Sequence, residues 1–371
     1  MLLQDTLLLP KTRKICGNSV CLVGFDGFID TIVRCVKTRK NVRHVTYYKK
    51  MSEFAKKIEQ AAGHSANFEF VQQEQKLGGN APILAEALTQ SGCLVTVIGA
   101  LGYPDIDKEF LPLTKRCQEV ISLCRSGHTT ALEFSDGKLL LGQHESVLSI
   151  DDTLLIKQIG QKKLIELFNS LDLFVSANWT MILGMTSIWK YLLKSVLPKL
   201  EQKKRIAFFD LADPCKRSKK DLSSALMLIS EMQKHFQVTL GLNVSESTQV
   251  SAVLGLSAHK DFKKRAHEIQ KKLKIHEVVI HALDKAAAAT DTDQNSINGP
   301  YCKHPLITTG GGDNFNAGFC LGLLLNLDQT DCLTLASYTS GYYVRTGKSP
   351  TLKELSHFLT HAMSELFLRP L

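Results

Sequence analysis

The chain has 371 residues, 44% of them hydrophobic and 22% charged, which is ordinary for a soluble globular protein. The net charge of +9 comes from several basic clusters with which aromatic residues do not interleave. Solvated helix faces explain such clusters better than a nucleic-acid groove does, although a mildly basic surface also suits anionic ligands such as nucleotides.

The ten cysteines and the apolar segments argue for a cytoplasmic protein. The cysteines form no CxxC pair and no Cys/His metal spacing, which is typical of reduced thiols. In residues 1–14 the basic residues follow the apolar patch instead of preceding it, which makes a poor signal peptide. The longest apolar run, at 319–327, is too short to span a bilayer. We therefore expect a soluble, cytoplasmic protein with no membrane and no nucleic-acid partner.

The first buried strand is predicted at residues 19–25, an apolar run rich in β-formers that contains Gly24. Two carboxylates, Asp26 and Asp30, come next. Open α/β sheets bind ligands beyond the C-terminal ends of their strands, so both are candidates for a ligand contact. Each could instead cap the following turn.

The interval 31–76 has a different character, with short β-branched and aromatic runs around one amphipathic segment. We expect strands at 31–36, 42–48 and 68–73, and a helix at 52–62 with Ser52 as its N-cap.

A glycine pair, Gly78 and Gly79, then precedes Asn80 and a helix with Pro82 in its first turn. The helix is expected to stop at Gly92, and a strand at 94–99 to follow it.

From residue 129 onward, strands and helices alternate. The pattern predicts a hairpin at 129–143, helices at 154–167, 185–197 and 332–347, and strands at 171–176, 205–210, 238–242 and 276–282. Such regular alternation favours a mostly parallel sheet with right-handed crossovers.

Two polar segments follow the last two of these strands. Asn243 and Glu246 form an N-x-x-E pattern, in which Ser245 and Glu246 could be no more than helix-start residues. Residues 283–287 are expected to form a loop, in which Lys285 could supply positive charge to a ligand or simply be solvated.

Residues 307–319 give the strongest indication of function in the sequence. Thr308 leads into Gly310, Gly311 and Gly312, and Asp313 precedes an apolar run from 315 to 327 that reads as a helix. Glycine amides at a helix start form an anion site suited to a phosphate. A carboxylate beside such a site repels the phosphate, unless it removes the proton from a hydroxyl that attacks the phosphorus. Asp313 could also be an ordinary helix-start residue.

These segments, from the glycine pair through Asn243–Glu246 to the glycine turn, resemble the ribokinase/phosphofructokinase-B (PfkB) family of carbohydrate kinases. The resemblance implies a three-layer α/β/α sandwich on a mostly parallel sheet, with a small β-sheet lid. The core would comprise residues 1–30, 77–128 and 146–371, and the lid residues 31–76 and 129–145.

The resemblance further implies ATP-dependent phosphorylation of a hydroxyl on a small sugar or sugar-like substrate. Asp313 would be the general base, and Gly310, Gly311 and Gly312 the anion hole. The remaining roles fall into three groups: sugar contacts from Asp30 first and Asp26 second, with Gly78, Gly79 and Asn80; a Mg²⁺ site at Asn243 and Glu246, which would also contact ATP; and further ATP contacts from Thr308 and Lys285.

Three positions depart from the family pattern. Ile307 stands where the family usually has Asp, Ile83 where it often has Asn, and residues 283–287 lack the expected glycines. A nucleoside kinase of the same family and a catalytically idle ligand-binding relative therefore remain as alternatives. A homodimer formed through lid strands is a further possibility, since the β-rich 42–48 segment could pair with a second copy.

Overall fold

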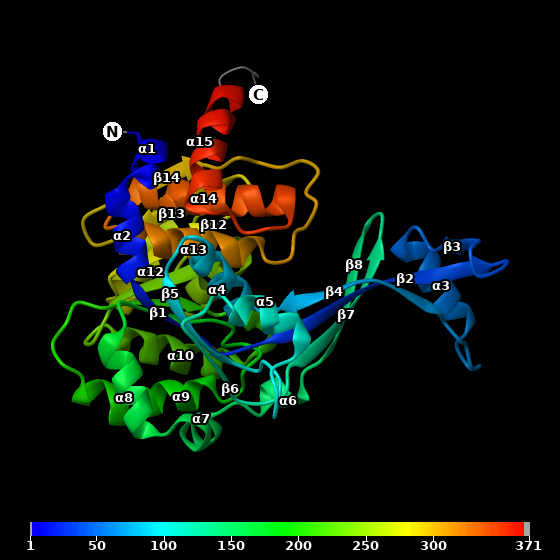
Figure 1. The fold of residues 1–371 in the computed structure, drawn as a ribbon, viewed down its shortest axis with the longest axis horizontal. Helices are drawn as coiled ribbons and strands as arrows, with labels where there is room; N and C mark the ends of the chain where they lie inside the picture. Colours follow the sequence, from blue (N-terminus) through cyan, green and yellow to red (C-terminus); the bar gives the residue numbers. More distant parts are fainter. Residues whose placement is uncertain (1, 367–371) are drawn as a thin grey trace.

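The computed structural model describes residues 2–366 and is built on a nine-stranded sheet in the order β14-β13-β12-β11-β10-β9-β1-β5-β6 (Figure 1). The strands from β12 through β6 in this order pair in parallel, and β13 pairs antiparallel with both of its neighbours, β12 and β14. The bounds are β1 Val20–Gly24, β5 Leu94–Gly99, β6 Glu119–Ser122, β9 Leu173–Ser176, β10 Ile206–Asp210, β11 Gln237–Asn243, β12 Glu277–His281, β13 Lys285–Ala289 and β14 Gln294–Asn298.

Both faces of this sheet are buried, because successive side chains point to opposite sides of a strand. Leu22 and Phe174 pack into the core on one face, and Val23 and Val175 into the core on the other. The first face is covered by α7 Asp152–Ile159, α8 Gln161–Ser170, α9 Met185–Tyr191, α10 Lys219–Met232, α11 Val244–Val253 and α12 Phe262–Leu273. The second is covered by α1 Leu3–Leu8, α2 Pro10–Asn18, α4 Asn80–Gln90, α13 Gly311–Leu324, α14 Gln329–Thr346 and α15 Leu352–Leu366. The predicted α/β/α sandwich is therefore confirmed.

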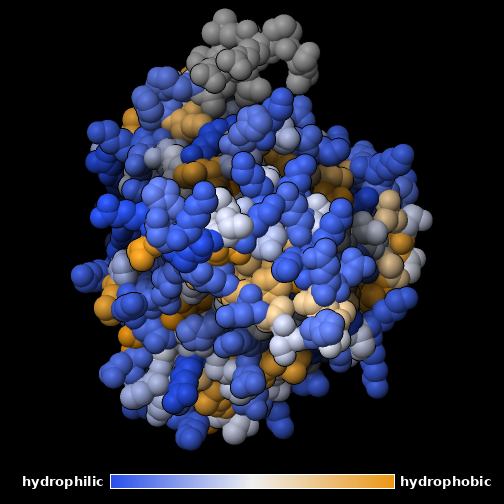
Figure 2. All heavy atoms as spheres, turned by 90° about the vertical axis from the view of Figure 1, so that its right-hand side faces the viewer, coloured by the Kyte–Doolittle hydropathy of each residue, from blue (hydrophilic) through white to orange (hydrophobic). Residues whose placement is uncertain are grey.

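A second, five-stranded sheet projects from the sandwich, with β3 and α3 at its far end (Figure 1). Its order is β3-β2-β7-β8, and β4 pairs with β2. The face on that side is largely hydrophilic, with apolar atoms gathered near its middle (Figure 2). Leu140 and Leu141 of β8 are more than half exposed, at 59% and 53%. The bounds are β2 Phe28–Arg39, β3 Val45–Tyr47, α3 Met51–Gln60, β4 Phe70–Gly78, β7 Gly127–Phe134 and β8 Gly137–Gln143. That this sheet closes over a ligand stays a prediction.

The structure corrects four local expectations. The helix predicted at 154–167 is two helices, because Gly160 has φ +80° and breaks the run. The helix predicted at 185–197 widens into a π-helical turn at Leu192–Val196 and ends in the 3-10 turn Leu197–Lys199. The third helix begins at Met51, so Ser52 lies inside it and is not its N-cap.

The fourth correction concerns residues 283–287, which do not form a loop. Only Leu283 and Asp284 turn the chain, and Lys285–Ala289 is strand β13, paired antiparallel with β12. Alanine is a poor strand former. Here the four alanines of β13 are all buried, and their small side chains suit the tight packing between the sheet and its helices.

Several short elements had no clear signal in the sequence, including β6 and β14 and the single-turn helices α5 Leu111–Thr114 and α6 Glu145–Leu148. Within residues 2–366, no helix combines the length and the hydropathy that crossing a membrane requires.

Candidate active site

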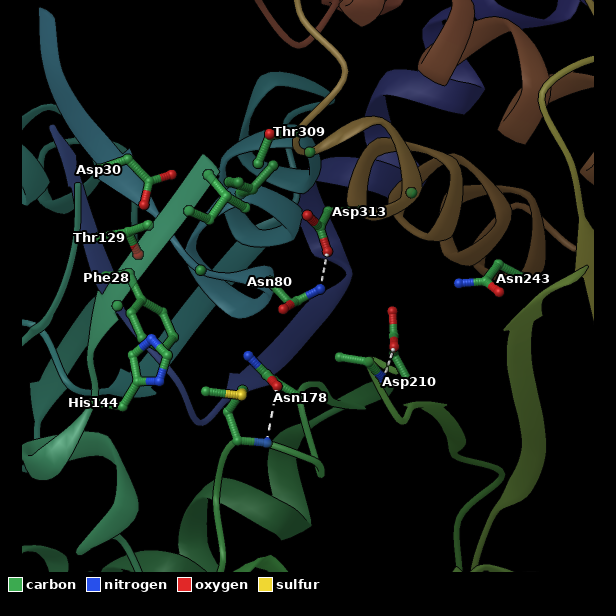
Figure 3. Close-up of a pocket in the computed structure, with 18 of the residues that line it drawn as sticks. Phe28, Asp30, Asn80, Thr129, His144, Asn178, Asp210, Asn243, Thr309 and Asp313 are labelled. Carbon is green, nitrogen blue, oxygen red and sulfur yellow. Dashed lines mark hydrogen bonds between the residues drawn. The ribbon is translucent and has the colours of Figure 1, made fainter. Parts of the chain in front are cut away.

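Five neighbouring parallel strands end at one edge of the large sheet, and a polar residue stands at or just beyond the end of each. These residues are Asp26 after β1, Asn178 after β9, Asp210 in β10, Asn243 in β11 and His281 in β12. Helix α13 begins at the same edge, so its first turn faces these side chains (Figure 3). In open α/β sheets this edge is where ligands bind.

The glycine turn forms the start of α13, as the sequence predicted. Gly310 has φ +91°, and a Cβ there would lie 2.6 Å from the hydroxyl oxygen of Tyr343, so only glycine fits. The amide of Gly311 donates to the carbonyl of Thr308 at 3.2 Å. The amides of Gly312 and Asp313 belong to the first helical turn and have no acceptor within the described residues. The anion hole of Gly310, Gly311 and Gly312 stays a prediction; of the amides from Gly310 to Asp313, that of Gly311 has an acceptor within the described residues.

Asp313 is only 7% exposed, yet its side chain lines a cavity beside this turn. Its Oδ1 accepts a hydrogen bond from Nδ2 of Asn80 at 2.8 Å (Figure 3). Burial raises the pKa of Asp313 well above its ordinary value, and the negative charge of Asp210 raises it further. The carboxyl group is therefore accessible from the cavity and is a stronger base than a surface aspartate.

The cavity has a volume of about 430 Å³, and we call it the acidic cavity because four carboxylates line it: Asp30, Asp210, Glu246 and Asp313. Asn80, Asn178, Thr129 and His144 add further polar groups. Such a lining offers many acceptors and several donors, which suits a small ligand with several hydroxyl groups.

The two aspartates after β1 have different surroundings. Asp30 lines the acidic cavity, and burial raises its pKa. A Cβ on Gly78 would lie 2.5 Å from the Asp30 carboxylate, so this glycine makes room for the aspartate instead of touching the cavity. Asp26 is fully buried and accepts hydrogen bonds from the amides of Asn80 at 2.9 Å and Ala81 at 2.7 Å, and from Nδ2 of Asn178 at 2.6 Å. Asp26 therefore holds cavity residues in place and is not part of the lining.

Asn243 and Glu246 form a capping box at the start of α11. The Asn243 side chain accepts from the amide of Glu246 at 3.0 Å, and Glu246 Oε2 accepts from the amide of Asn243 at 2.8 Å. Glu246 Oε1 accepts from the amide of Asp213 at 2.9 Å. Burial raises the pKa of Glu246, and also that of Asp210, which the charge of Glu246 raises further. The helix-start interpretation is thus correct, while both residues also line the acidic cavity.

A second cavity, of about 500 Å³, lies next to the first. We call it the basic cavity because Lys285 and Lys303 line it, and no carboxylate among the described residues does. Thr308, one of the predicted ligand contacts, also lines it. Lys285 is exposed, and its Nζ lies 4.5 Å from the ring centroid of Phe262. Asn243, His281 and Gly312 line both cavities.

Sequence reasoning missed several lining residues. Asn178, Asp210 and His281 all stand at strand ends, so the strand-end rule that selected Asp26 and Asp30 could have found them. His144 and Lys216 had no such signal, because they reach the acidic cavity from the connection after β8 and from the 3-10 turn Pro214–Lys216, whose paths the sequence does not reveal.

Comparison with known proteins places this architecture among the ribokinase-like kinases. Arabidopsis thaliana ribokinase, solved with ribose and ATP, superposes with a TM-score of 0.64 at 15% identity over 92% of this chain and 99% of its own. The nucleoside kinase of Burkholderia thailandensis, solved with inosine, gives a TM-score of 0.60 at 14% identity over 93% and 99%. Similarity at this level of identity establishes the fold.

The sequence itself establishes the family. Residues 9–362 match the family model described as prokaryotic ketohexokinase. A ketohexokinase of Haloferax volcanii is 26% identical over 354 residues, which cover 93% of this chain and 92% of the relative. The chain belongs to the prokaryotic ketohexokinase family, and with it to the ribokinase/PfkB sugar kinases, which transfer a phosphoryl group to a hydroxyl acceptor. The predicted family and enzyme class are therefore confirmed.

Proposed function

We propose that this protein transfers the γ-phosphoryl group of ATP to a hydroxyl of a ketohexose or a similar small sugar. The sugar would occupy the acidic cavity and the nucleotide the basic cavity. The observation that carries the proposal is the place of Asp313, which lines the acidic cavity on the same helical turn as Gly312, a residue shared by both cavities.

Asp313 is the proposed general base. It would take the proton of the attacking hydroxyl as the new phosphorus–oxygen bond forms. A raised pKa brings a carboxylate toward the range in which general bases work at neutral pH. The hydrogen bond from Asn80 leaves Oδ2 of Asp313 without a protein donor among the described residues, so that oxygen can face the hydroxyl.

The amides of Gly312 and Asp313 are the proposed anion hole. Both lie in the first turn of α13, where unpaired N–H groups and the helix dipole favour negative charge. Donors held in place in this way stabilise charge that develops on phosphoryl oxygens without having to reorganise during the reaction. Gly310 would allow the chain to turn, and Gly311 would hold the turn through the hydrogen bond of its amide to Thr308.

The residues present also fit a magnesium ion. Asp210, Glu246 and Asn243 offer carboxylate and amide oxygens, the ligands that Mg²⁺ prefers, and the negative charges of the acidic cavity raise one another's pKa values. Within the described residues, no cluster of three or more His, Cys, Asp or Glu forms a ready-made metal site. Such a sparse set suits a metal that takes further ligands from phosphates and water. When bound, the ion would neutralise charge on the phosphate groups.

The acceptor class follows from the family and the lining. The curated relative is a ketohexokinase, and the acidic cavity offers Asp30, Asn80 and Asn178 to sugar hydroxyls. A nucleoside acceptor is the second candidate, since one solved neighbour is a nucleoside kinase and Ile83 contributes an apolar wall. A homodimer formed through the projecting sheet stays a prediction.

The test is an ADP-release assay with ATP, Mg²⁺ and a panel of ketohexoses, aldoses and nucleosides. We expect a ketohexose to give the highest kcat/KM. Asp313→Asn keeps the acceptor for Asn80 and should lower kcat by about 10²–10⁴, the usual contribution of a general base. Asp291→Asn, the same chemical change at the exposed β13–β14 turn, serves as the matched control and should retain wild-type turnover.

Near-normal turnover by the Asp313→Asn variant would show that another group is the base. Binding of ATP by calorimetry without ADP release on any acceptor would instead favour an idle ligand-binding relative.

A further inference from the structure

His281 stands at the boundary between the two cavities. It is the last residue of β12 and contributes to the walls of both the acidic and the basic cavity. Asn243 and Gly312 are the other residues that do so. The Asn243 side-chain oxygen already accepts a hydrogen bond from the amide of Glu246, and Asn243 is a proposed magnesium ligand, whereas Gly312 has no side chain. His281 therefore places a polar side chain at the boundary that the phosphoryl group would cross between the two cavities.

The imidazole ring is held in a fixed plane. It stacks on Phe315 of α13, with 4.5 Å between the ring centroids and an interplanar angle of 27°. Its Cε1 atom lies 3.6 Å from the position of a Cβ on Gly312. The carbon between the two ring nitrogens thus faces the helical turn whose amides are unpaired.

Neither ring nitrogen of His281 has a hydrogen-bond partner within the described residues. His281 is partly exposed where it lines the two cavities, and neither ring nitrogen is a fully buried atom without a partner, so both can be reached by a ligand. Burial lowers the pKa of His281 to about 4. At neutral pH the ring is therefore uncharged, with one nitrogen that donates and one that accepts.

We propose that His281 donates a hydrogen bond to the phosphoryl group during its transfer and is a catalytic residue of this kinase. The inference rests on the reaction proposed above. In that reaction the bond between the γ-phosphorus and the ADP oxygen breaks, a bond to the acceptor oxygen forms, and the acceptor proton goes to Asp313. His281 keeps its own proton throughout and adds one neutral donor to the amides of Gly312 and Asp313.

Three substitutions separate this role from simple packing. His281→Phe keeps an aromatic ring on Phe315 and removes both nitrogens. His281→Asn and His281→Gln lose the ring but place an amide N–H near the positions of Nδ1 and Nε2. All three are measured with wild type for kcat, for KM of ATP and of the sugar, and for the midpoint of thermal unfolding.

We expect His281→Phe to unfold at the wild-type midpoint and to lose about 10²-fold in kcat, the typical effect of removing one such donor, with both KM values within about threefold. Either His281→Asn or His281→Gln should recover at least part of that loss, and the better one identifies the donating nitrogen.

The opposite ranking, with His281→Phe near wild type and both amide variants impaired, would assign the ring to packing and overturn the proposal. An equal loss of kcat in all three would overturn it too. Absence of turnover by wild type on every acceptor would reject the kinase reaction itself, and with it this role.

Discussion

Buried charged side chains have different electrostatic surroundings at the two ends of the large sheet. At the C-terminal edge, Asp26, Asp210, Glu246 and Asp313 are all buried, and within the described residues none has an ion-pair partner. At the N-terminal edge, the guanidinium of Arg205 is equally buried, at 4% exposed. Its donors are satisfied by backbone carbonyls, and the opposite charges of Glu201 and Asp172 favour its charged form.

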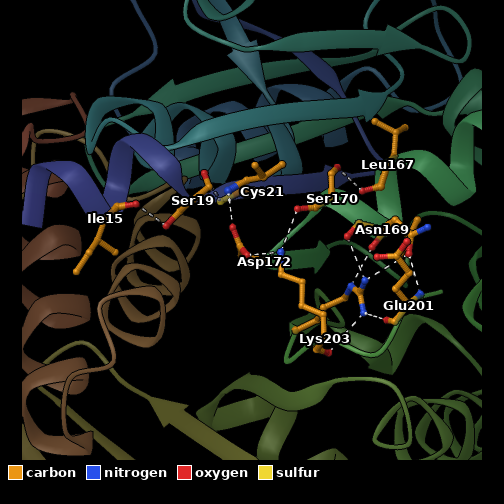
Figure 4. Close-up of polar contacts among 12 residues, drawn as sticks. Ile15, Ser19, Cys21, Leu167, Asn169, Ser170, Asp172, Glu201 and Lys203 are labelled. Carbon is orange, nitrogen blue, oxygen red and sulfur yellow. Dashed lines mark hydrogen bonds and ion pairs between the residues drawn. The ribbon is translucent and has the colours of Figure 1, made fainter.

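The N-terminal arrangement is visible around Asp172, just before β9 (Figure 4). Arg205 donates to the carbonyls of Phe168 at 3.0 Å, Glu201 at 2.8 Å and Asn169 at 3.1 Å, and so joins the end of α8 to the chain that enters β10. Asp172 accepts from the amide of Val20 and pairs with Lys203 at 2.6 Å.

The difference indicates what each end is for. A hydrogen-bonded cation with opposite charges nearby holds segments of the fold together, whereas carboxylates whose pKa values are raised by burial and by one another destabilise the fold and are typical of a reactive site. The comparison predicts that substitutions at the N-terminal edge lower stability and leave catalysis intact, and that those at the C-terminal edge impair catalysis without lowering stability.

The largest effect on stability is expected for Arg205→Met. This variant keeps most of the side-chain volume but removes the hydrogen bonds to the carbonyls of Phe168, Glu201 and Asn169, each contributing about 1 kcal/mol or more because the donor is charged. We expect the free energy of unfolding in urea to fall by about 3 kcal/mol, while kcat stays within twofold of wild type at a temperature where both are folded. A loss of kcat without a loss of stability would contradict the division between the two ends.

The second prediction concerns pH. Burial raises the pKa of Asp26, Asp210, Glu246 and Asp313 in the folded protein, while in the unfolded chain these groups have pKa values of about 4. Between about pH 4 and the raised values, the folded state holds more protons than the unfolded state. The contribution of these groups to the free energy of unfolding is therefore largest at low pH and falls as pH rises, by at most about 1.4 kcal/mol per pH unit for each proton.

Asp210→Asn sharpens that test. The variant removes one of the repelling carboxylates, and the Nδ2 of the new side chain can donate to Oδ1 of Asn316, which is buried without a partner, once the Asn316 amide rotates. We expect the decline of the free energy of unfolding from pH 6 to pH 8, measured in urea without Mg²⁺, to be shallower than in wild type. At pH 8 the variant should be about 1 kcal/mol more stable. If wild type and variant show the same change in the free energy of unfolding with pH, the carboxylate of Asp210 is not repelled by its neighbours.

The smallest effect is expected for Lys203→Ala. Lys203 and Asp172 are 40% and 32% exposed, and solvent-exposed ion pairs contribute at most about 1 kcal/mol. Unfolding in urea should show a change of less than about 1 kcal/mol, with kcat unaffected. A cost equal to that of Arg205→Met would mean that the ion pair, and not the buried guanidinium, stabilises this end.

The sequence by itself determined the features that depend on neighbouring residues. Alternating apolar runs predicted most strands and helices of the sandwich, and three consecutive glycines followed by Asp313 predicted an anion site at a helix start. These features depend on φ/ψ preferences and on side-chain periodicity, which a few consecutive residues set. The projecting sheet was also visible, as β-rich runs on either side of the first glycine pair.

Only the tertiary structure decided which polar groups share a site. Asn80 and Asp313 are hydrogen-bonded although 233 positions separate them, and Asn178 reaches Asp26 over 152 positions. Asp26 and Asp30 look equivalent in sequence, yet one is enclosed by amide donors and the other faces the cavity. His281 lies between the cavities because β12 pairs with β11 and because α13 packs against the histidine ring. Side-chain access and pKa depend on contacts between distant segments, and local sequence does not encode those contacts.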